Sequence, residues 1–157
     1  MVIAKMNALL EPTVIEKLYE ASQAGVTIHL IVRGVCALRP GIPGVSDNIR
    51  VRSIIGRFLE HHRVFYFYND GAEDLYLSSA DWMGRNLFRR IEIAFPILDP
   101  KIKKRVIREG LRPFLVDNAQ AWEMQSDGRY RRKNVRSGKR RSAQGMLLAD
   151  LQAGPRT

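Results

Sequence analysis

His61 and Arg63 are the pair of side chains in this sequence best suited to act on an anionic oxygen. An imidazole can relay protons or accept phosphate near neutral pH, and a guanidinium supplies a fixed cation with a planar fork of donors. Because residues two apart in a strand project to the same side, the two groups would face one ligand. His62 should then point the other way. A histidine at the entrance of a strand can equally be structural.

Arg33 is a second candidate, because it directly follows a buried apolar segment. Ligands of open α/β sheets bind at the carboxyl ends of the strands, where a rigid guanidinium would suit phosphate. Its alternative role is to cap the strand through a carboxylate such as Asp47. His29 lies inside the apolar segment, which favours a core histidine. Further arginines cluster around the following loop and could complete a cationic wall: Arg39, Arg50, Arg52 and Arg57.

A strand, a helix and a second strand must position Arg33. Buried strands are predicted over 2–6 and 26–32, with an amphipathic helix over 12–24 between them. Such a βαβ unit has a right-handed crossover and parallel strands. Asn7 and Arg33 should therefore lie side by side where these strands end.

A hairpin must position His61. Strands are predicted over 64–68 and 75–78, on either side of the Asn-Asp-Gly turn at 69–71. Because the two open ends of a hairpin align, His61 should lie opposite Ser78, Ser79 and Asp81. These residues supply two hydroxyls and a carboxylate. These groups could orient the imidazole and fix its tautomer.

The remaining segments complete an α/β fold with a mixed sheet flanked by helices. Strands are expected over 49–55, 91–95 and 119–124, with irregular loops over 38–48 and 81–86. Asp99 and Pro100 should open a helix. Its expected buried stripe consists of Ile102, Val106, Ile107, Leu111, Phe114 and Leu115. A turn over 126–129 and a short helix over 142–151 are the last expected elements.

Composition bounds the class of protein. The chain has 157 residues, of which 45% are hydrophobic, which suits one compact domain. It has no apolar run of the roughly 20 residues that cross a membrane, and no signal-peptide pattern, so a soluble cytoplasmic protein is expected. The single cysteine, Cys36, cannot form an internal disulfide or a thiolate metal cage and is expected in the core. P-loop, GxGxxG and metal-ligand motifs are lacking.

The basic charge is concentrated near one end. Of the formal net charge of +10, eight basic residues lie between Arg129 and Arg141, with no acidic residue among them. The rest of the chain is nearly balanced. Such a segment is typical of a solvated, mobile tail, although contact with a polyanion is the alternative. A non-enzymatic module that binds nucleic acid or another polyanion is therefore a competing hypothesis.

Four stretches of the sequence resemble the C-terminal end of bacterial polyphosphate kinase, which reversibly moves phosphate between ATP and polyphosphate. They are AKMNALLEP (4–12), LIVRGVCALRPGIPGVSDNIRVRSIIGRFLEHHRVFYF (30–67), YLSSADWMGRN (76–86) and RRIEIAFPILDP (89–100). The resemblance implies a phospholipase D-like domain over 1–133. Residues 134–157 are expected to form a basic, flexible tail.

The resemblance also implies roles for the candidate residues. Arg33 would contact the nucleotide phosphates, and His61 would be the second catalytic histidine, as an acid/base or as a stabiliser of the transferring group. Arg63 would share the phosphate. Asn7, Ser78, Ser79 and Asp81 would support them. The phospholipase D pattern, HxK with an Asp and GSxN, is altered here to His-x-Arg and Ser-Ser-Ala-Asp without the Asp at its expected place. A nuclease completed by homodimerisation is therefore the least favoured hypothesis.

Part of the chemistry is expected outside this sequence. In the family that it resembles, the histidine that becomes phosphorylated and the ligands of Mg²⁺ belong to the preceding domain. The implied partners are ATP or ADP, polyphosphate and the preceding domains, in an enzyme that is homo-oligomeric at full length. Since Met1 falls inside the family's first strand, we expect an excised or truncated domain. It should be inactive alone, because the covalent route needs a nucleophile in line with the phosphoryl group.

Overall fold

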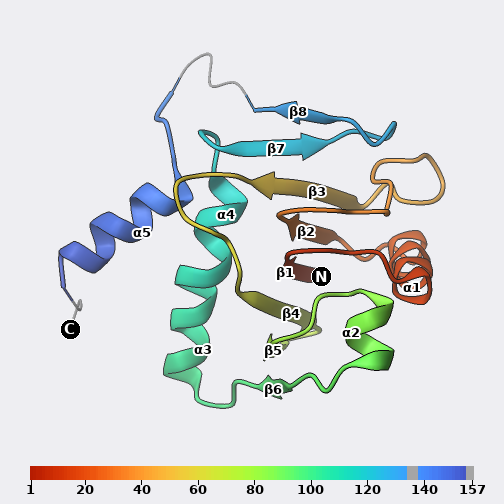
Figure 1. Ribbon diagram of the computed structural model, residues 1–157, viewed down its shortest axis with the longest axis horizontal. Helices are drawn as coiled ribbons and strands as arrows, with labels where there is room; N and C mark the ends of the chain where they lie inside the picture. Colours follow the sequence, from red (N-terminus) through yellow and green to blue (C-terminus); the bar gives the residue numbers. More distant parts are fainter. Residues whose placement is uncertain (134–137, 155–157) are drawn as a thin grey trace.

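The computed structural model describes residues 1–133 and 138–154, and these form one mixed sheet covered by helices on both faces. The sheet has eight strands in the order β6-β5-β4-β1-β2-β3-β7-β8 (Figure 1). The strands are β1 (Val2–Met6), β2 (Ile28–Val32), β3 (Ile49–Ile54), β4 (Arg63–Asn69), β5 (Ala72–Ser78), β6 (Ala94–Pro96), β7 (Ala121–Met124) and β8 (Tyr130–Arg132). The predicted α/β class is confirmed.

The centre of the sheet is the expected βαβ unit. Strands β1 and β2 are parallel, with Val2 opposite Ile28, and β3 continues the parallel pairing from β2. Helix α1 (Pro12–Gln23) connects the first two strands. Proline at its first turn and the Glu11 side chain, which accepts the Val14 amide at 2.6 Å, explain where it begins.

Antiparallel strands flank this unit, and their direction creates the site. Strand β4 pairs antiparallel with β1, and β5 pairs antiparallel with β4. The ends of β1, β2, β3 and β5 and the start of β4 therefore all lie at one margin of the sheet, called here the site edge. Residues 55–62 pass along this edge from β3 to β4, which lies on the far side of β1 and β2 in the strand order.

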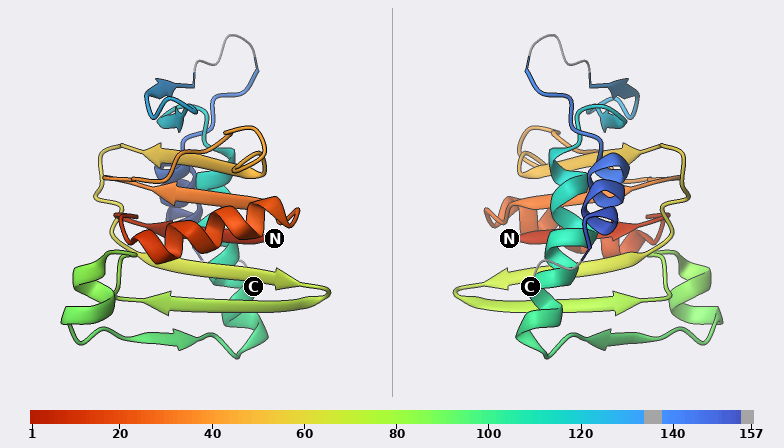
Figure 2. Two further views of the ribbon diagram at one scale, coloured as in Figure 1. Left: turned by 90° about the vertical axis from the view of Figure 1, so that its right-hand side faces the viewer. Right: turned by 90° about the vertical axis from the view of Figure 1, so that its left-hand side faces the viewer.

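Two apolar cores fill the space between the sheet and its helices. Helix α1 covers one face, while α3 (Pro100–Val106), a π-helical segment (Ile107–Leu111), α4 (Arg112–Val116) and α5 (Ala143–Gln152) cover the other (Figure 2). Leu30 and Met6 belong to the first core, and Phe114 and Leu111 to the second. No helix in the described part of the chain is long and apolar enough to span a membrane.

Several local expectations were wrong. Ile102 is 52% exposed instead of buried, so the buried stripe of the long helix begins only at Val106. The loop expected over 81–86 contains the start of a short helix, α2 (Gly84–Arg89). Strand β6 is shorter than predicted and begins three residues later. Cys36 is half-buried and packs against the first core.

The expectation of a flexible tail over 134–157 also needs correction. Residues 134–137 and 155–157 lie outside the described part, but α5 forms where a short helix was predicted and its start is anchored. Ala143 is fully buried, and its amide donates to Asp117 Oδ2 at 2.7 Å. The basic residues before it are not all in a tail either, since β8 pairs with β7. The C-terminal helix is therefore part of the domain.

Candidate functional site

Four separate segments meet at the site edge. Asn7 directly follows β1, Arg33 directly follows β2, His61 lies two residues before β4, and Asp81 lies three residues after β5. Each of these residues stands just outside a strand, where the neighbouring strands fix its backbone while its side chain stays free of the sheet's own pairing. The parallel unit and the antiparallel hairpin thus bring together groups that are up to 74 residues apart.

Asp81 is the centre of this arrangement. Its carboxylate is buried and accepts the backbone amides of Asn7 at 2.7 Å and Ala8 at 3.3 Å. It also accepts two bonds from Arg63, from Nε to Oδ1 at 3.1 Å and from Nη2 to Oδ2 at 2.9 Å. Such a bidentate pair fixes the guanidinium in one plane. Asp81 therefore ties the end of β1 to the start of β4.

Arg63 in turn contacts His61. Its Nη1 lies 3.0 Å from the His61 Nδ1 atom and donates to the His61 carbonyl at 2.8 Å. The arginine is thus held from one side by Asp81 and touches an exposed imidazole on the other. The predicted neighbourhood of His61 and Arg63 is present. Asp81 acts on the imidazole through Arg63, not by direct contact.

Arg33 and Asn7 lie side by side, as the βαβ unit predicted. Arg33 Nε donates to Asn7 Oδ1 at 3.0 Å, while Asp47 accepts the Gly44 amide instead of capping Arg33. The Asn7 Nδ2 group is buried and has no hydrogen-bond partner among the described residues. A buried donor without a partner is costly, so it is a natural contact for a bound anion.

Ser78 and Ser79 do not orient the imidazole, and this part of the expectation was wrong. The Ser78 hydroxyl donates to the Ile93 carbonyl at 3.1 Å. The Ser79 hydroxyl bonds to Glu92 and accepts the Ile93 amide at 3.0 Å. Both serines therefore fasten β5 to the segment before β6. Their role at the site edge is to support the turn that carries Asp81.

His62 lies on the opposite face of the sheet, as predicted. Its ring packs edge-on against Phe114, with 5.5 Å between the ring centroids, and its Nδ1 lies 3.4 Å from Lys5 Nζ. Partial burial and then the charge of Lys5 lower the pKa of His62, whose side chain still has 43% of its surface exposed. His62 is therefore part of the packing under α4 and the π-helical segment.

A buried ion pair beneath the site edge was not predicted. Lys5, the fourth of the five residues of β1, is 2% exposed and donates to Glu60 Oε2 at 2.8 Å. Its Nζ lies 4.2 Å from the centre of the Phe114 ring. Burial lowers the pKa of Lys5, and the hydrogen bond to Glu60 opposes that shift. A lysine inside an otherwise apolar strand was the sequence signal for such a partner.

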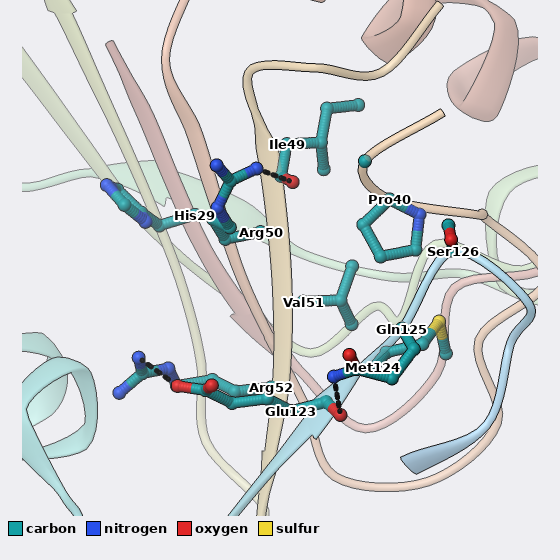
Figure 3. Close-up of a pocket in the computed structure, with 11 residues that line it drawn as sticks. His29, Pro40, Ile49, Arg50, Val51, Arg52, Glu123, Met124, Gln125 and Ser126 are labelled. Atoms are coloured by element: carbon teal, nitrogen blue, oxygen red, sulfur yellow. Dashed lines mark hydrogen bonds and ion pairs between the residues drawn. The ribbon is translucent and has the colours of Figure 1, made fainter. Parts of the chain in front are cut away.

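One pocket among the described residues lies away from the site edge. It has a volume of about 590 Å³ and lies beside the first half of β3, where β7 no longer pairs (Figure 3). His29 lines it instead of lying in the core, and burial and then the charges of Arg52 and Arg50 lower its pKa. Arg52 is bonded to Glu123 at 3.3 Å and Arg50 to the Ile49 carbonyl at 3.0 Å. His29 is about 13 Å along β2 from Arg33, at roughly 3.3 Å per residue. The convergence of charged groups, not the pocket volume, therefore identifies the site.

The site edge is suited to an anion and not to a metal ion. Its functional groups are two guanidinium groups, an imidazole and an amide, and the Asp81 carboxylate is already bonded to Arg63 and two backbone amides. Magnesium prefers oxygen ligands with free lone pairs. Nowhere in residues 1–133 and 138–154 do three or more metal-binding side chains gather. The residues do not fit Mg²⁺.

The ionisation of Asp81 predicts how stability depends on pH. Burial alone would raise its pKa, but the bonds from Arg63 and the Asn7 amide outweigh burial and lower it. A carboxyl whose folded pKa lies below its unfolded value of about 3.9 stabilises the fold above that pH, and loses this contribution as pH falls through the folded value. Urea unfolding of the wild type and Asp81→Asn should therefore differ most above about pH 5, with the difference shrinking below pH ~4. A difference independent of pH would contradict the ion pair.

Comparison with known proteins connects this geometry with one family. Residues 1–144 match the family model described as "Polyphosphate kinase C-terminal domain 2". The chain is 70% identical to a polyphosphate kinase of Burkholderia lata and 68% identical to one of Paraburkholderia phytofirmans, over 94% of its own length in each case. It covers 21% of each relative, so it spans about a fifth of their length. A crystal structure of polyphosphate kinase from Porphyromonas gingivalis superposes with a TM-score of 0.91 at 43% identity, over 97% of this chain and 23% of that one.

Proposed function

Because this chain belongs to the polyphosphate kinase family, as its C-terminal domain 2, we propose that its site edge binds and orients phosphate during reversible transfer between ATP and polyphosphate. The observation that carries the proposal is one continuous chain of hydrogen bonds: from Arg33 to Asn7, then to Asp81, Arg63 and His61. Phosphoryl transfer depends on positioning and on fixed positive charge, and this chain of bonds supplies both.

Each residue of the site edge has a separate role in this proposal. Arg33 contacts the nucleotide phosphates, and the unpartnered Asn7 Nδ2 group donates to the same anion. His61 acts on the transferring phosphoryl group, as an acid/base or as a stabiliser of its charge. Arg63 shares the negative charge and keeps the imidazole in place. Asp81 binds no substrate, since its oxygens are bonded within the protein.

The site is one half of a larger one. We place the histidine that becomes phosphorylated, and the ligands of Mg²⁺, in the portion of the family's polypeptide that this chain does not cover. A covalent phosphohistidine route needs that nucleophile in line with the phosphoryl group. The chain alone should therefore bind phosphate chains but transfer none at an appreciable rate. ATP or ADP, polyphosphate and the rest of the enzyme are its partners.

Arg33→Ala should weaken the binding of tripolyphosphate and ADP to this chain by roughly 10- to 100-fold, because a charge-assisted hydrogen bond contributes about 1.5–3 kcal/mol. Isothermal titration calorimetry at fixed ionic strength measures the effect. Arg50→Ala is the matched control, since it removes the same charge from an exposed guanidinium beside the pocket near β3. Equal weakening by the two variants would show that only net charge matters, and the assignment of Arg33 would fall.

The competing hypothesis, a polyanion-binding module without enzymatic function, can be tested on the basic segment. Lys133 pairs with Glu123 at 3.1 Å and Arg132 donates to the Ala119 carbonyl at 3.3 Å, so part of this charge is engaged within the fold. Deleting everything after Asn134 would also remove α5. Replacing Lys139, Arg140 and Arg141 by glutamine is therefore the sharper change. In a full-length polyphosphate kinase that carries this domain, transfer activity should survive this change, whereas a binding module would lose its main activity.

A further inference from the structure

The first turn of α5 contacts the segment that carries His61. The Gln144 side chain is 6% exposed, and its Nε2 donates to the Phe58 carbonyl at 2.8 Å and to Glu60 Oε1 at 2.7 Å. Its Oε1 accepts the Phe58 amide at 3.0 Å. One side chain thus makes three hydrogen bonds to a stretch that ends one residue before His61.

This stretch has little else to hold it. Its large apolar side chains point outward, with Ile55 at 62% exposed, Phe58 at 46% and Leu59 at 67%, so apolar burial does not anchor it. Its other attachments are Glu60, which accepts the buried bond from Lys5 in β1, and the Ile55 amide, which donates to the Gln120 carbonyl at 3.5 Å. Gln144 bonds to the same Glu60 carboxylate. The position of the segment therefore depends on polar contacts.

Gln144 is itself held in place from beneath. Asp117 is fully buried, and its Oδ2 accepts the Ala143 amide at 2.7 Å, directly before Gln144. The other oxygen of Asp117 accepts the amides of Ala119, Gln120 and Ala121 at the start of β7. The sheet thus fixes the start of α5, and α5 fixes the segment. Figure 2 shows α5 on the same face as α4, near the edge where residues 55–62 pass.

Gly56 shows how closely Gln144 lies against this backbone. A Cβ atom added at Gly56 would overlap with Gln144 Oε1 and with Gln120 Nε2, both closer to it than any real Cβ contact. Neither contact is sterically possible, so a methyl group at this position would displace the Gln144 amide and break its bonds. The sequence therefore has a glycine where the two parts meet.

We propose that Gln144 is a positioning residue: through Phe58 and Glu60, the C-terminal helix sets the place of His61 relative to Arg63. The inference rests on the proposed function for its catalytic consequence only. Arg33 and Arg63 are held independently, by Asn7 and Asp81. Loss of Gln144 should therefore disturb the histidine and leave the phosphate-binding arginines in place.

Gln144→Ala should free the Phe58 amide, whose hydrogen exchange is expected to become at least about 10-fold faster, since its hydrogen bond to Gln144 and the two neighbouring ones are lost. Gly56→Ala should also speed exchange at Phe58, because the added methyl group would displace the Gln144 amide. NMR-detected exchange on this chain measures both. Leu147→Ala is the control, because it removes packing of α5 against the second core without touching the Gln144 bonds. Equal acceleration at Phe58 in this control would overturn the inference.

The catalytic consequence is measured separately in a full-length polyphosphate kinase that carries this domain. There Gln144→Ala should lower kcat by roughly 10-fold while the KM for the nucleotide changes less than about twofold, which is the pattern for loss of an interaction made in the transition state. An unchanged kcat alongside fast exchange at Phe58 would overturn the positioning role. The exchange rate at Phe58 tests the Gln144 contact whether or not His61 is catalytic. Failure of the proposed function can therefore be told apart from failure of this inference.

Discussion

His61→Ala in a full-length polyphosphate kinase that carries this domain is expected to lower kcat for transfer from ATP to polyphosphate by a factor of roughly 10² to 10⁴. This is the usual contribution of a positioned acid/base or of a preorganised group at the developing charge. The substitution is a local one. Arg63 keeps its two bonds to Asp81 and its bond to the His61 carbonyl, which alanine retains.

The structure offers two comparisons for this variant. His61→Gln keeps a hydrogen-bonding group near Arg63 but cannot exchange protons, so it should be as inactive as His61→Ala if His61 is an acid/base, and should retain part of the activity if His61 stabilises charge. His62→Ala removes the neighbouring imidazole, which lies on the other face against Phe114, and should leave kcat within a few-fold. Because His61 is exposed, its removal should change the free energy of unfolding by no more than about 0.5 kcal/mol. Near-normal transfer by His61→Ala and Arg33→Ala together would remove the site assignment.

The sequence predicted the site edge because its signals were local. Apolar runs separated by an amphipathic helix define a βαβ unit, and that unit alone places Asn7 beside Arg33. An Asn-Asp-Gly turn defines a hairpin, and the hairpin alone brings Asp81 to the strand that begins at Arg63. Both inferences need only the order of the strands and whether neighbouring strands run parallel or antiparallel. The backbone positions at the site edge follow from these two facts.

The hydrogen-bond and packing partners of individual side chains could not be predicted from the strand order. Ser78 and Ser79 were assigned to His61 because they lie at the right end of β5, but a third segment, Glu92 and Ile93, competes for their hydroxyls. Ile102 has the spacing of a buried residue, yet its side chain is exposed. Which of several equivalent polar or apolar neighbours is chosen depends on the packing of distant segments.

The contact between Gln144 and the His61 segment is the clearest case of what a sequence pattern hides. The bonded residues are 84 and 86 apart, and glutamine at the start of a helix has no unusual local signature. The basic residues before it indicated a solvated tail, and the short helix predicted over 142–151 had no predicted partner in the fold. Glycine at position 56 and lysine at position 5 were the available signals, since each is exceptional in its segment.

Asp81→Ala should have the largest effect on stability of any substitution at the site edge. It removes the acceptor of two backbone amides and leaves the Arg63 guanidinium buried without its partner. Breaking a buried pair in this way typically costs about 3–5 kcal/mol. Urea unfolding at pH 7 measures the loss. Asp74→Ala, which removes an exposed carboxylate from β5, the strand before Asp81, should change the free energy of unfolding by no more than about 0.5 kcal/mol.

Asp81→Asn separates the two tasks of this carboxylate. The amide oxygen can still accept the Asn7 and Ala8 amides, so the end of β1 stays in place, but the amide nitrogen faces Arg63 as a second donor. Stability should fall by about 1.5–3 kcal/mol, the worth of hydrogen bonds to a charged group. Binding of tripolyphosphate should weaken as well, because Arg63 is no longer held in one plane. If Asp81→Asn bound tripolyphosphate as tightly as the wild type, Arg63 would need no fixed orientation, and its place in the phosphate site would have to be given up.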